Sequence, residues 1–156
     1  MDLQQLREFR DTNIARLMQR ATRALITRLF AELHARGYKE LRVTHSALLA
    51  NLEDLEGTRI SVLAERAGIT KQAMGQLLVE LEAKGYVQSR VDPTDKRAKI
   101  VSFTAFGWQM MLDTVEVIRS LEAEYTAVLG ERGIQVLRTA LNLILDEVPP
   151  SDDFSS

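Results

Sequence analysis

Four basic and two acidic side chains are concentrated in residues 90–99, which read RVDPTDKRAK. Lys96 and Arg97 lie at the centre of this run, with Arg90 and Lys99 on its flanks. Ammonium and guanidinium groups bind phosphate, and a guanidinium is also favoured in a narrow minor groove of DNA, where the potential is most negative. Arg97 is the best candidate for such a contact.

The two acids, Asp92 and Asp95, are unsuited to touching an anion, so we expect them to shape the turn. Aspartate caps turns through the backbone, and a carboxylate beside an arginine fixes the direction of the guanidinium. Pro93 presets the turn. A hairpin of mixed charge is often only a solvated surface turn, so the neighbouring elements must decide its role.

A second polar group occupies residues 70–76, TKQAMGQ. The side-chain amides of Gln72 and Gln76 donate and accept in one plane, which matches the major-groove edge of adenine. Lys71 reaches guanine or phosphate, and Thr70 with the N–H groups of a first helical turn can hold a phosphate.

Gly75 lies inside this group and costs a helix about 0.5–1 kcal/mol relative to alanine. Close approach of a nucleic-acid backbone would explain that cost, and so would the crossing of another helix. A solvated polar face is the plain alternative, but this face carries no acid before Glu80.

Apolar spacing places both polar groups on one small module. Residues 61–68 are expected to form a two-turn helix closed by Gly68, which accepts a positive φ. Thr70 is a good N-cap for a helix that ends at Gly85. The buried face of that helix follows the spacing i, i+3, i+4, i+7 at Met74, Leu77, Leu78 and Leu81.

Residues 86–91 and 98–104 alternate as strands do on either side of the turn DPTDKR, which predicts an antiparallel hairpin. Residues 58–60 are a candidate for a short third strand. A helix-turn-helix followed at once by a hairpin is a winged helix. We therefore predict a winged helix-turn-helix DNA-binding module over residues 43–104.

Helices are predicted on both sides of this module. One amphipathic helix covers residues 1–36, and the helical pattern returns over residues 105–148 with a break at Gly130 and Gly133. The tail, residues 149–156, is expected to be flexible. The fold class is mainly α with a small β-hairpin wing (α+β), in which N- and C-terminal dimerisation helices flank the winged helix-turn-helix.

A further helix is predicted to begin at Thr44, as its N-cap, and to end before Gly57. Its buried face comprises Leu48, Leu49, Leu52 and Leu55.

The outer helices need a partner. The first is roughly 45 Å long at a rise of about 1.5 Å per residue, and the module alone cannot cover its apolar face. The last is apolar in a band broader than one neighbour would bury. We expect a homodimer in which the terminal helices of two chains interlock, with a monomeric helical cap as the alternative.

The net charge of −2 argues mildly against a nucleic-acid partner, but its distribution does not. Residues 58–104 carry eight basic and five acidic side chains, whereas residues 105–156 carry three and nine. The absence of cysteine excludes disulfides, thiolate metal sites and thiol redox sensors. With no apolar membrane span and a charged N-terminus, we expect a cytoplasmic protein with no membrane partner.

Three runs resemble the winged helix-turn-helix of MarR-type bacterial transcription regulators. They are the D-P-x-D-x-R-A-K wing at 92–99, the V-S-x-T strand at 101–104 and the L-E-x-K-G-Y-V junction at 81–87. The resemblance covers about residues 43–107, and the flanking helices agree only in order and length.

The resemblance implies an obligate dimer on a pseudo-palindromic operator, with each recognition helix in a major groove and each Arg97 in the adjacent minor groove. It also implies release from DNA by small, often aromatic ligands bound between the dimer helices and the module. Val79 stands where the family often has an acid, and Gln76 where it often has arginine, so operator preference does not carry over. The lack of cysteine excludes the peroxide-sensing branch.

The histidines, a tryptophan and a methionine are weaker candidates for a functional role. His34 and His45 are the only histidines, and with no clustered carboxylates beside them we expect no metal site. His45 opens the predicted second helix, near the pocket that the resemblance implies, but a surface or capping role is the reading we favour. Trp108 and Met111 are candidates to line an effector cavity, although packing is the usual role of such side chains.

The sequence thus predicts a dimeric, sequence-specific DNA-binding transcriptional regulator, a repressor released by a small ligand for which an aromatic compound is one candidate. The alternative is a winged-helix module for protein–protein assembly that reads no DNA sequence. Without a nucleophile motif, a glycine loop or a carboxylate pair, we expect no enzyme and no cofactor. The predicted contacts to double-stranded DNA are Thr70, Lys71, Gln72, Gly75, Gln76, Arg90, Asp95, Lys96, Arg97 and Lys99; those to a small-molecule effector are His45, Trp108 and Met111.

Overall fold

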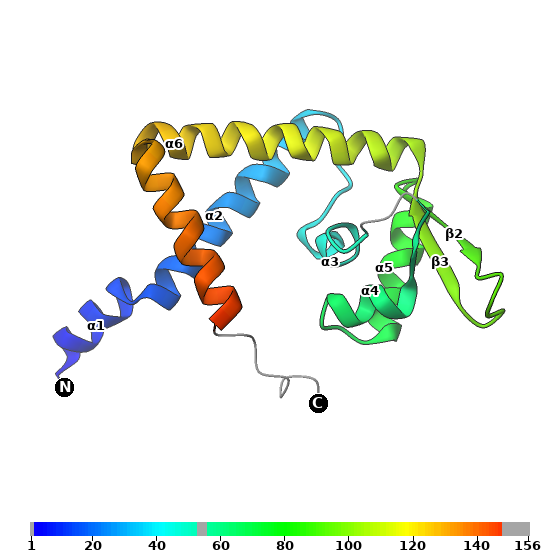
Figure 1. The fold of residues 1–156 in the computed structure, drawn as a ribbon, viewed down its shortest axis with the longest axis horizontal. Coiled ribbons are helices and arrows are strands. Elements are labelled where there is room, and N and C mark those ends of the chain that lie inside the picture. The colour runs from blue at the N-terminus through cyan, green and yellow to red at the C-terminus, as the bar shows by residue number, and fades with distance from the viewer. Residues whose placement is uncertain (1, 53–55, 148–156) are drawn as a thin grey trace. The chain divides into compact units, whose positions relative to one another are not determined.

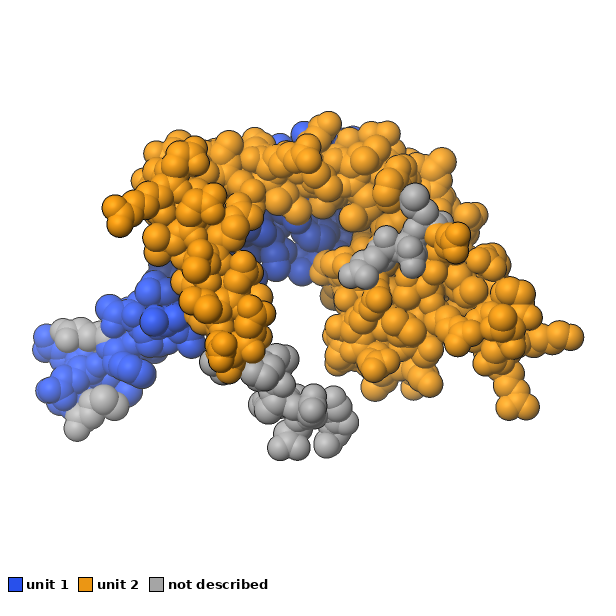
Figure 2. All heavy atoms as spheres, in the orientation of Figure 1, with its two compact units in different colours: residues 1–43 blue, residues 44–156 orange. Residues whose placement is uncertain are grey.

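A computed structural model describes residues 2–52 and 56–147, and every structural statement below refers to them. The chain divides into two compact units, Met1–Val43 and Thr44–Ser156, which Figure 2 colours separately. Each unit is described by itself.

The first unit contains α1 (Leu3–Thr12) and α2 (Ile14–Ala35). The prediction of one continuous helix is wrong, because the backbone of Asn13 is extended, with φ −67° and ψ 145°. The Asn13 side chain donates to the carbonyl of Phe9 at 2.9 Å and accepts from the N–H of Arg16 at 2.9 Å. One asparagine thereby ends the first helix and caps the second.

The second unit begins within a 3₁₀ turn, η1 (Val43–His45), and carries the winged module and one long helix (Figure 1). Its other elements are α3 (Ser46–Leu49), β1 (Thr58–Arg59), α4 (Ile60–Arg66), α5 (Lys71–Ala83), β2 (Val87–Val91), β3 (Lys99–Phe103) and α6 (Ala105–Glu147). The predicted fold class, mainly helical with a small wing, is confirmed.

The three strands form an antiparallel sheet in the order β1–β3–β2. Val87 faces Phe103 and Val91 faces Lys99 across the hairpin, and Thr58 pairs with Val101 on the other side of β3. The candidate third strand is confirmed. The hairpin extends beyond α4 and α5 of its own unit (Figure 1).

One face of α5 packs into the core of the module. Fully buried side chains come from α3, α4, α5 and β3: Leu48, Leu63, Met74, Leu78, Leu81 and Val101. Burying each such side chain stabilises the fold by about 1.5–3 kcal/mol. Leu77, predicted to lie on the same face, is half-buried. The opposite face of α5 is left to solvent.

The helix predicted between residues 44 and 57 is much shorter than expected. Among the described residues of this stretch, η1 and α3 are the helical elements, and His45, not Thr44, stands at the N-cap of α3. The Asn51 side chain donates to the carbonyl of Ala47 at 2.9 Å, a local bond that competes with further helix. Leu48, Leu49 and Leu52 are buried as predicted, and Leu55 lies outside the described residues.

The long helix α6 changes direction at Gly130, whose φ of 73° and ψ of 162° are not helical. A glycine adopts this positive φ at little cost. The predicted break is therefore confirmed at Gly130, whereas Gly133 shows no positive φ. The predicted flexible tail, 149–156, lies outside the described residues.

At its other end, α6 is held against the hairpin. The hydroxyl of Thr104 accepts from the N–H of Gly107 at 3.0 Å and so caps the helix. A Cβ on Gly107 would lie only 1.8 Å from the carbonyl oxygen of Tyr86. Only glycine therefore permits this approach of α6 to the base of β2.

Candidate nucleic-acid interface

The outer face of α5 presents most of the polar residues that the sequence singled out. Thr70, Lys71, Gln72 and Gln76 are exposed. The Thr70 hydroxyl accepts from the N–H of Ala73 at 3.1 Å, so its predicted N-cap role is confirmed. Gly68, at φ 63°, makes the turn that joins α4 to α5, as predicted.

Gly75 lies on α5 with open space around it. A Cβ built at this position would meet no heavy atom within 4 Å. Among the described residues, no helix crossing accounts for the missing side chain, and that explanation is excluded for this part of the chain. The other explanation, close approach by something outside the chain, remains a prediction.

Both acids of α5 are engaged by neighbouring side chains. Glu80 Oε2 lies 3.1 Å from Nε2 of His45, whose side chain is fully buried. Glu82 Oε1 accepts from the hydroxyl of Ser89 on β2 at 2.6 Å. The carboxylates that would oppose a phosphate are thus bound within the module, which favours an anionic partner at the face of α5.

The position of His45 differs from the predicted one. A surface or capping role is wrong, because the residue is 0% exposed and makes no capping bond to α3. The physical reason is the carboxylate of Glu80, 35 residues away, which gives a buried imidazole a polar partner.

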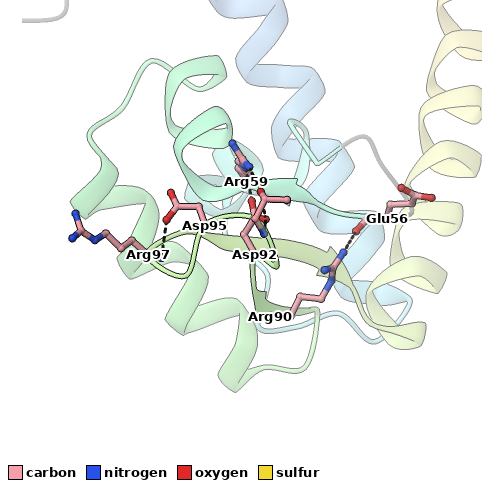
Figure 3. A network of polar contacts seen from close by, with 7 residues as sticks. Glu56, Arg59, Arg90, Asp92, Asp95 and Arg97 are labelled. Carbon is pink, nitrogen blue, oxygen red and sulfur yellow. Dashed lines mark hydrogen bonds and ion pairs between the residues drawn. The ribbon is translucent and has the colours of Figure 1, made fainter.

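Backbone and carboxylate bonds define the turn of the wing (Figure 3). The N–H of Asp92 donates to the carbonyl of Ala98 at 3.0 Å, and the N–H of Ala98 donates to the carbonyl of Asp95 at 2.9 Å. Asp95 Oδ1 accepts from the N–H of Arg97 at 3.0 Å. The prediction that the acids shape this turn is confirmed.

Asp92 is buried at the base of the turn by contacts that the sequence did not suggest. Its Oδ1 accepts from the hydroxyl and N–H of Thr94 at 2.7 and 2.8 Å, and its Oδ2 accepts from Nε of Arg59 at 2.6 Å. The hydrogen bonds from Thr94, and then the Arg59 guanidinium, lower the pKa of Asp92 to about 2. The arginine that this carboxylate fixes is therefore Arg59 on β1, which sequence reasoning missed.

The remaining cations of the wing lie at the surface. Lys96, Arg97 and Lys99 are exposed, and within residues 2–52 and 56–147 no acid forms an ion pair with them. Arg90 is also exposed, and its Nη2 donates to the carbonyl of Glu56 at 3.2 Å (Figure 3). Three cations are thus presented at the wing and a fourth is tied to the segment before β1.

The three candidate effector residues differ in burial, and none of them lines the open groove found among the described residues. His45 is buried, Met111 is half-buried, and the half-exposed ring of Trp108 is tilted against Phe103 at 6.1 Å. This groove, of about 440 Å³, lies in the first unit, and sequence reasoning missed it. It is lined by Met18, Gln19, Thr22, Arg23, Ile26, Thr27 and Val43. The effector role of the three residues stays a prediction.

Two further findings concern other classes of protein. No three His, Asp or Glu side chains of the described residues are grouped as metal ligands. None of the described helices combines the length and the apolar character needed to cross a membrane.

Comparison with known proteins accords with this geometry. Residues 40–98, which include α4, α5 and the wing turn, match the model of the MarR family. This segment of the chain is therefore similar to the MarR family. The transcriptional regulator HosA of Escherichia coli O111:H- is 28% identical over 100 residues, which are 62% of this chain and 74% of HosA.

Two solved structures share the fold of this chain over most of its length. CouR from Rhodococcus jostii RHA1, bound to p-coumaroyl-CoA, superimposes with a TM-score of 0.68 at 23% identity and covers 92% of this chain and 97% of its own. PcaV from Streptomyces coelicolor, in complex with its natural ligand, gives a TM-score of 0.68 at 18% identity and covers 88% and 94%. Residues 40–98 thus match a family of transcriptional regulators, and the chain shares the fold seen in CouR and PcaV.

Proposed function

We propose that the chain acts as a homodimeric repressor of a pseudo-palindromic operator, with α5 in the major groove and the wing in the adjacent minor groove. The exposed cations Lys96, Arg97 and Lys99, without acid partners among the described residues, carry this proposal. Exposed lysine and arginine supply most of the affinity of a protein for the DNA backbone.

The second support is the outer face of α5. Its exposed glutamines and lysine are of the types that can read base edges, and its two acids are bound by His45 and Ser89. A helix of this kind fits the major groove, which is about 12 Å wide and admits an α-helix.

The dimer is supported by apolar surface that the single chain leaves uncovered. Leu137, Leu141 and Ile144 are 39–43% exposed and form one stripe on the final helical segment. Large side chains on α1 and α2 are exposed as well, among them Leu3, Phe9 and Ile14. A second copy of the chain would cover such faces, and a twofold dimer would place its two reading heads about 34–36 Å apart, one turn of DNA.

The proposal includes release of the protein from DNA by a small ligand. CouR and PcaV, which share the fold, were solved with small molecules bound. A ligand that binds only the dimer whose heads are wrongly spaced would lower DNA affinity by shifting the population. Aromatic acids and their CoA thioesters are the class to test first.

The test is a binding titration of the full chain with duplexes from its own promoter region and with random duplexes, at several salt concentrations. The proposal expects specific binding about 10³-fold or more above random DNA, with log K falling steeply as log salt rises. Equal affinity for the two kinds of duplex would overturn it. A shallow salt slope together with capture of a protein partner would favour the assembly module instead.

A further inference from the structure

One exposed side chain on α5 has no role in the fold. Val79 is 65% exposed, although valine is apolar and less favourable in a helix than most residues. The buried face of α5 is built from Met74, Leu78 and Leu81, so Val79 contributes nothing to the core.

Val79 shares its face with both glutamines. At 3.6 residues per turn, Gln72, Gly75, Gln76 and Val79 fall within an arc of about 100° on the side opposite the core residues. Gln72 and Gln76 are exposed, and their side-chain amides have no hydrogen-bond partner among the described residues. The open space at Gly75 lets a partner approach the helix between them.

The side chains of this face match the major-groove edge of an A·T base pair. A glutamine amide forms two hydrogen bonds to N6 and N7 of adenine, and an apolar side chain contacts the C5-methyl of thymine. Guanine is read chiefly by arginine or lysine, and cytosine by a carboxylate. This arc carries none of those groups: Lys71 lies at its edge, and the carboxylate of Glu80 is bound to His45.

We propose that α5 selects A·T base pairs, with Gln72 and Gln76 reading adenine and Val79 packing on a thymine methyl group. From Gln72 to Val79 the helix rises about 10 Å, which spans roughly three base-pair steps of 3.4 Å. Each half-site is therefore A·T-rich over about three to four adjacent positions. The inference rests on the proposed function, namely that α5 enters the major groove.

The experiment begins with selection of bound duplexes from a random pool by the full-length protein. In the best duplex, each thymine of the half-site is then replaced by deoxyuridine, which lacks only the methyl group, and each adenine by 7-deazaadenine, which lacks the N7 acceptor. Affinities are measured for the wild type and for the Val79→Ala and Gln76→Ala variants. Val128→Ala, at an exposed valine of α6, is the matched control.

Deoxyuridine at one position should lower the DNA affinity of the wild type about fourfold, which corresponds to the loss of one buried methyl group. It should leave the DNA affinity of the Val79→Ala variant unchanged. 7-Deazaadenine at one position should lower the DNA affinity of the wild type roughly 5- to 100-fold. It should leave the DNA affinity of the Gln76→Ala variant unchanged. The Val128→Ala variant should respond to both substitutions as the wild type does.

The outcomes separate this inference from the proposed function. If no selected duplex binds better than random DNA, the proposed function itself fails. If binding is specific but the half-sites are G·C-rich, or if the analogues weaken the wild type and the variants equally, the regulator stands and the assignment of Val79 and the glutamines is overturned.

Discussion

Arg59 and Asp92 hold the two edges of the sheet together, with 2.6 Å between Nε and Oδ2 (Figure 3). Arg59 lies on β1 and Asp92 directly follows β2, and β3 runs between these strands. Arg59 also stands at the N-cap position of α4. The contact therefore ties the base of the wing turn to the start of the helix-turn-helix, so that the wing and the helix-turn-helix keep a fixed relation.

This contact predicts how stability depends on pH. The pKa of Asp92 is lowered to about 2, so its ionised form stabilises the fold. That stabilisation is complete above the ordinary pKa of an unfolded aspartate, near 3.8, and is lost as the pH falls from there through about 2. Urea denaturation at pH values from about 6 to 2 should show a steeper acid loss for the wild type than for Asp92→Asn.

The matched control for that experiment is Asp95→Asn, which removes the same charge from the same turn but leaves the Arg59–Asp92 contact in place. It should keep the steep acid loss of the wild type. Parallel pH profiles for the wild type and Asp92→Asn would show that this contact does not stabilise the fold.

Arg97→Ala tests the wing. Loss of this exposed guanidinium should weaken operator binding by about 1–3 kcal/mol and reduce the salt slope by about one, with the fold unchanged. Fluorescence anisotropy at several salt concentrations measures both quantities. Arg119→Ala, at an exposed arginine of α6, should change neither, and an Arg97→Ala protein that binds as the wild type does would remove the wing from the interface.

Gly75→Ala should move stability and binding in opposite directions. Because a Cβ there meets open space in a helical backbone, alanine should stabilise the fold by about 0.5–1 kcal/mol. The same methyl group should obstruct close approach of DNA and weaken binding about fivefold or more. Thermal unfolding and DNA titration measure the two effects.

The comparison variant is Gly107→Ala, whose Cβ would lie 1.8 Å from Tyr86 O and should destabilise the protein. A Gly75→Ala protein that binds DNA as well as the wild type would contradict the reading of Gly75 as a contact point.

The buried His45 and its half-exposed partner Glu80 should be coupled energetically. A double-mutant cycle of His45→Ala and Glu80→Ala, read by urea denaturation, should give a coupling energy of about 0.5–3 kcal/mol, since the two side chains meet at 3.1 Å with the imidazole fully buried. Arg138 and Glu122, a half-exposed pair at 3.6 Å on α6, provide the control cycle and should give a value near zero. Equal coupling energies in the two cycles would show that the His45–Glu80 contact stabilises α5 no more than a surface ion pair does.

The proposed dimer can be broken at the final helical segment. Leu141→Glu places a charge in the exposed apolar stripe and should convert a sedimenting dimer to a monomer with greatly reduced operator affinity. Gln135→Glu adds the same charge to the opposite side of that segment and should leave the dimer intact. A Leu141→Glu protein that still sediments as a dimer would place the interface elsewhere.

The winged module was predictable because its signals are local. Thr70 caps α5 through its own hydroxyl, Gly68 supplies the positive φ of the turn, and strand alternation sets the hairpin. Where local chemistry opposes the apolar pattern, the prediction failed. Asn13 lies within a helical apolar repeat, yet its side chain satisfies backbone groups on both sides and stops the helix.

Contacts between distant parts of the chain were not predictable. His45 and Glu80 are 35 residues apart, and Arg59 and Asp92 are 33 apart. No spacing rule connects such pairs, because the tertiary fold alone brings them together. The sequence therefore identified which side chains face outward on α5 and the wing, but not which side chains hold those elements in place.

The missing side chain at Gly107 has a mechanical consequence. Since α6 touches the carbonyl of Tyr86 without any intervening atom, the helix and the base of the wing cannot slide past each other. The segment of α6 from Ala105 to Gly130 is then a lever arm of roughly 37 Å, rigidly joined to the hairpin. A tilt imposed at the Gly130 end would reach the wing as a rotation of the whole module through the same angle.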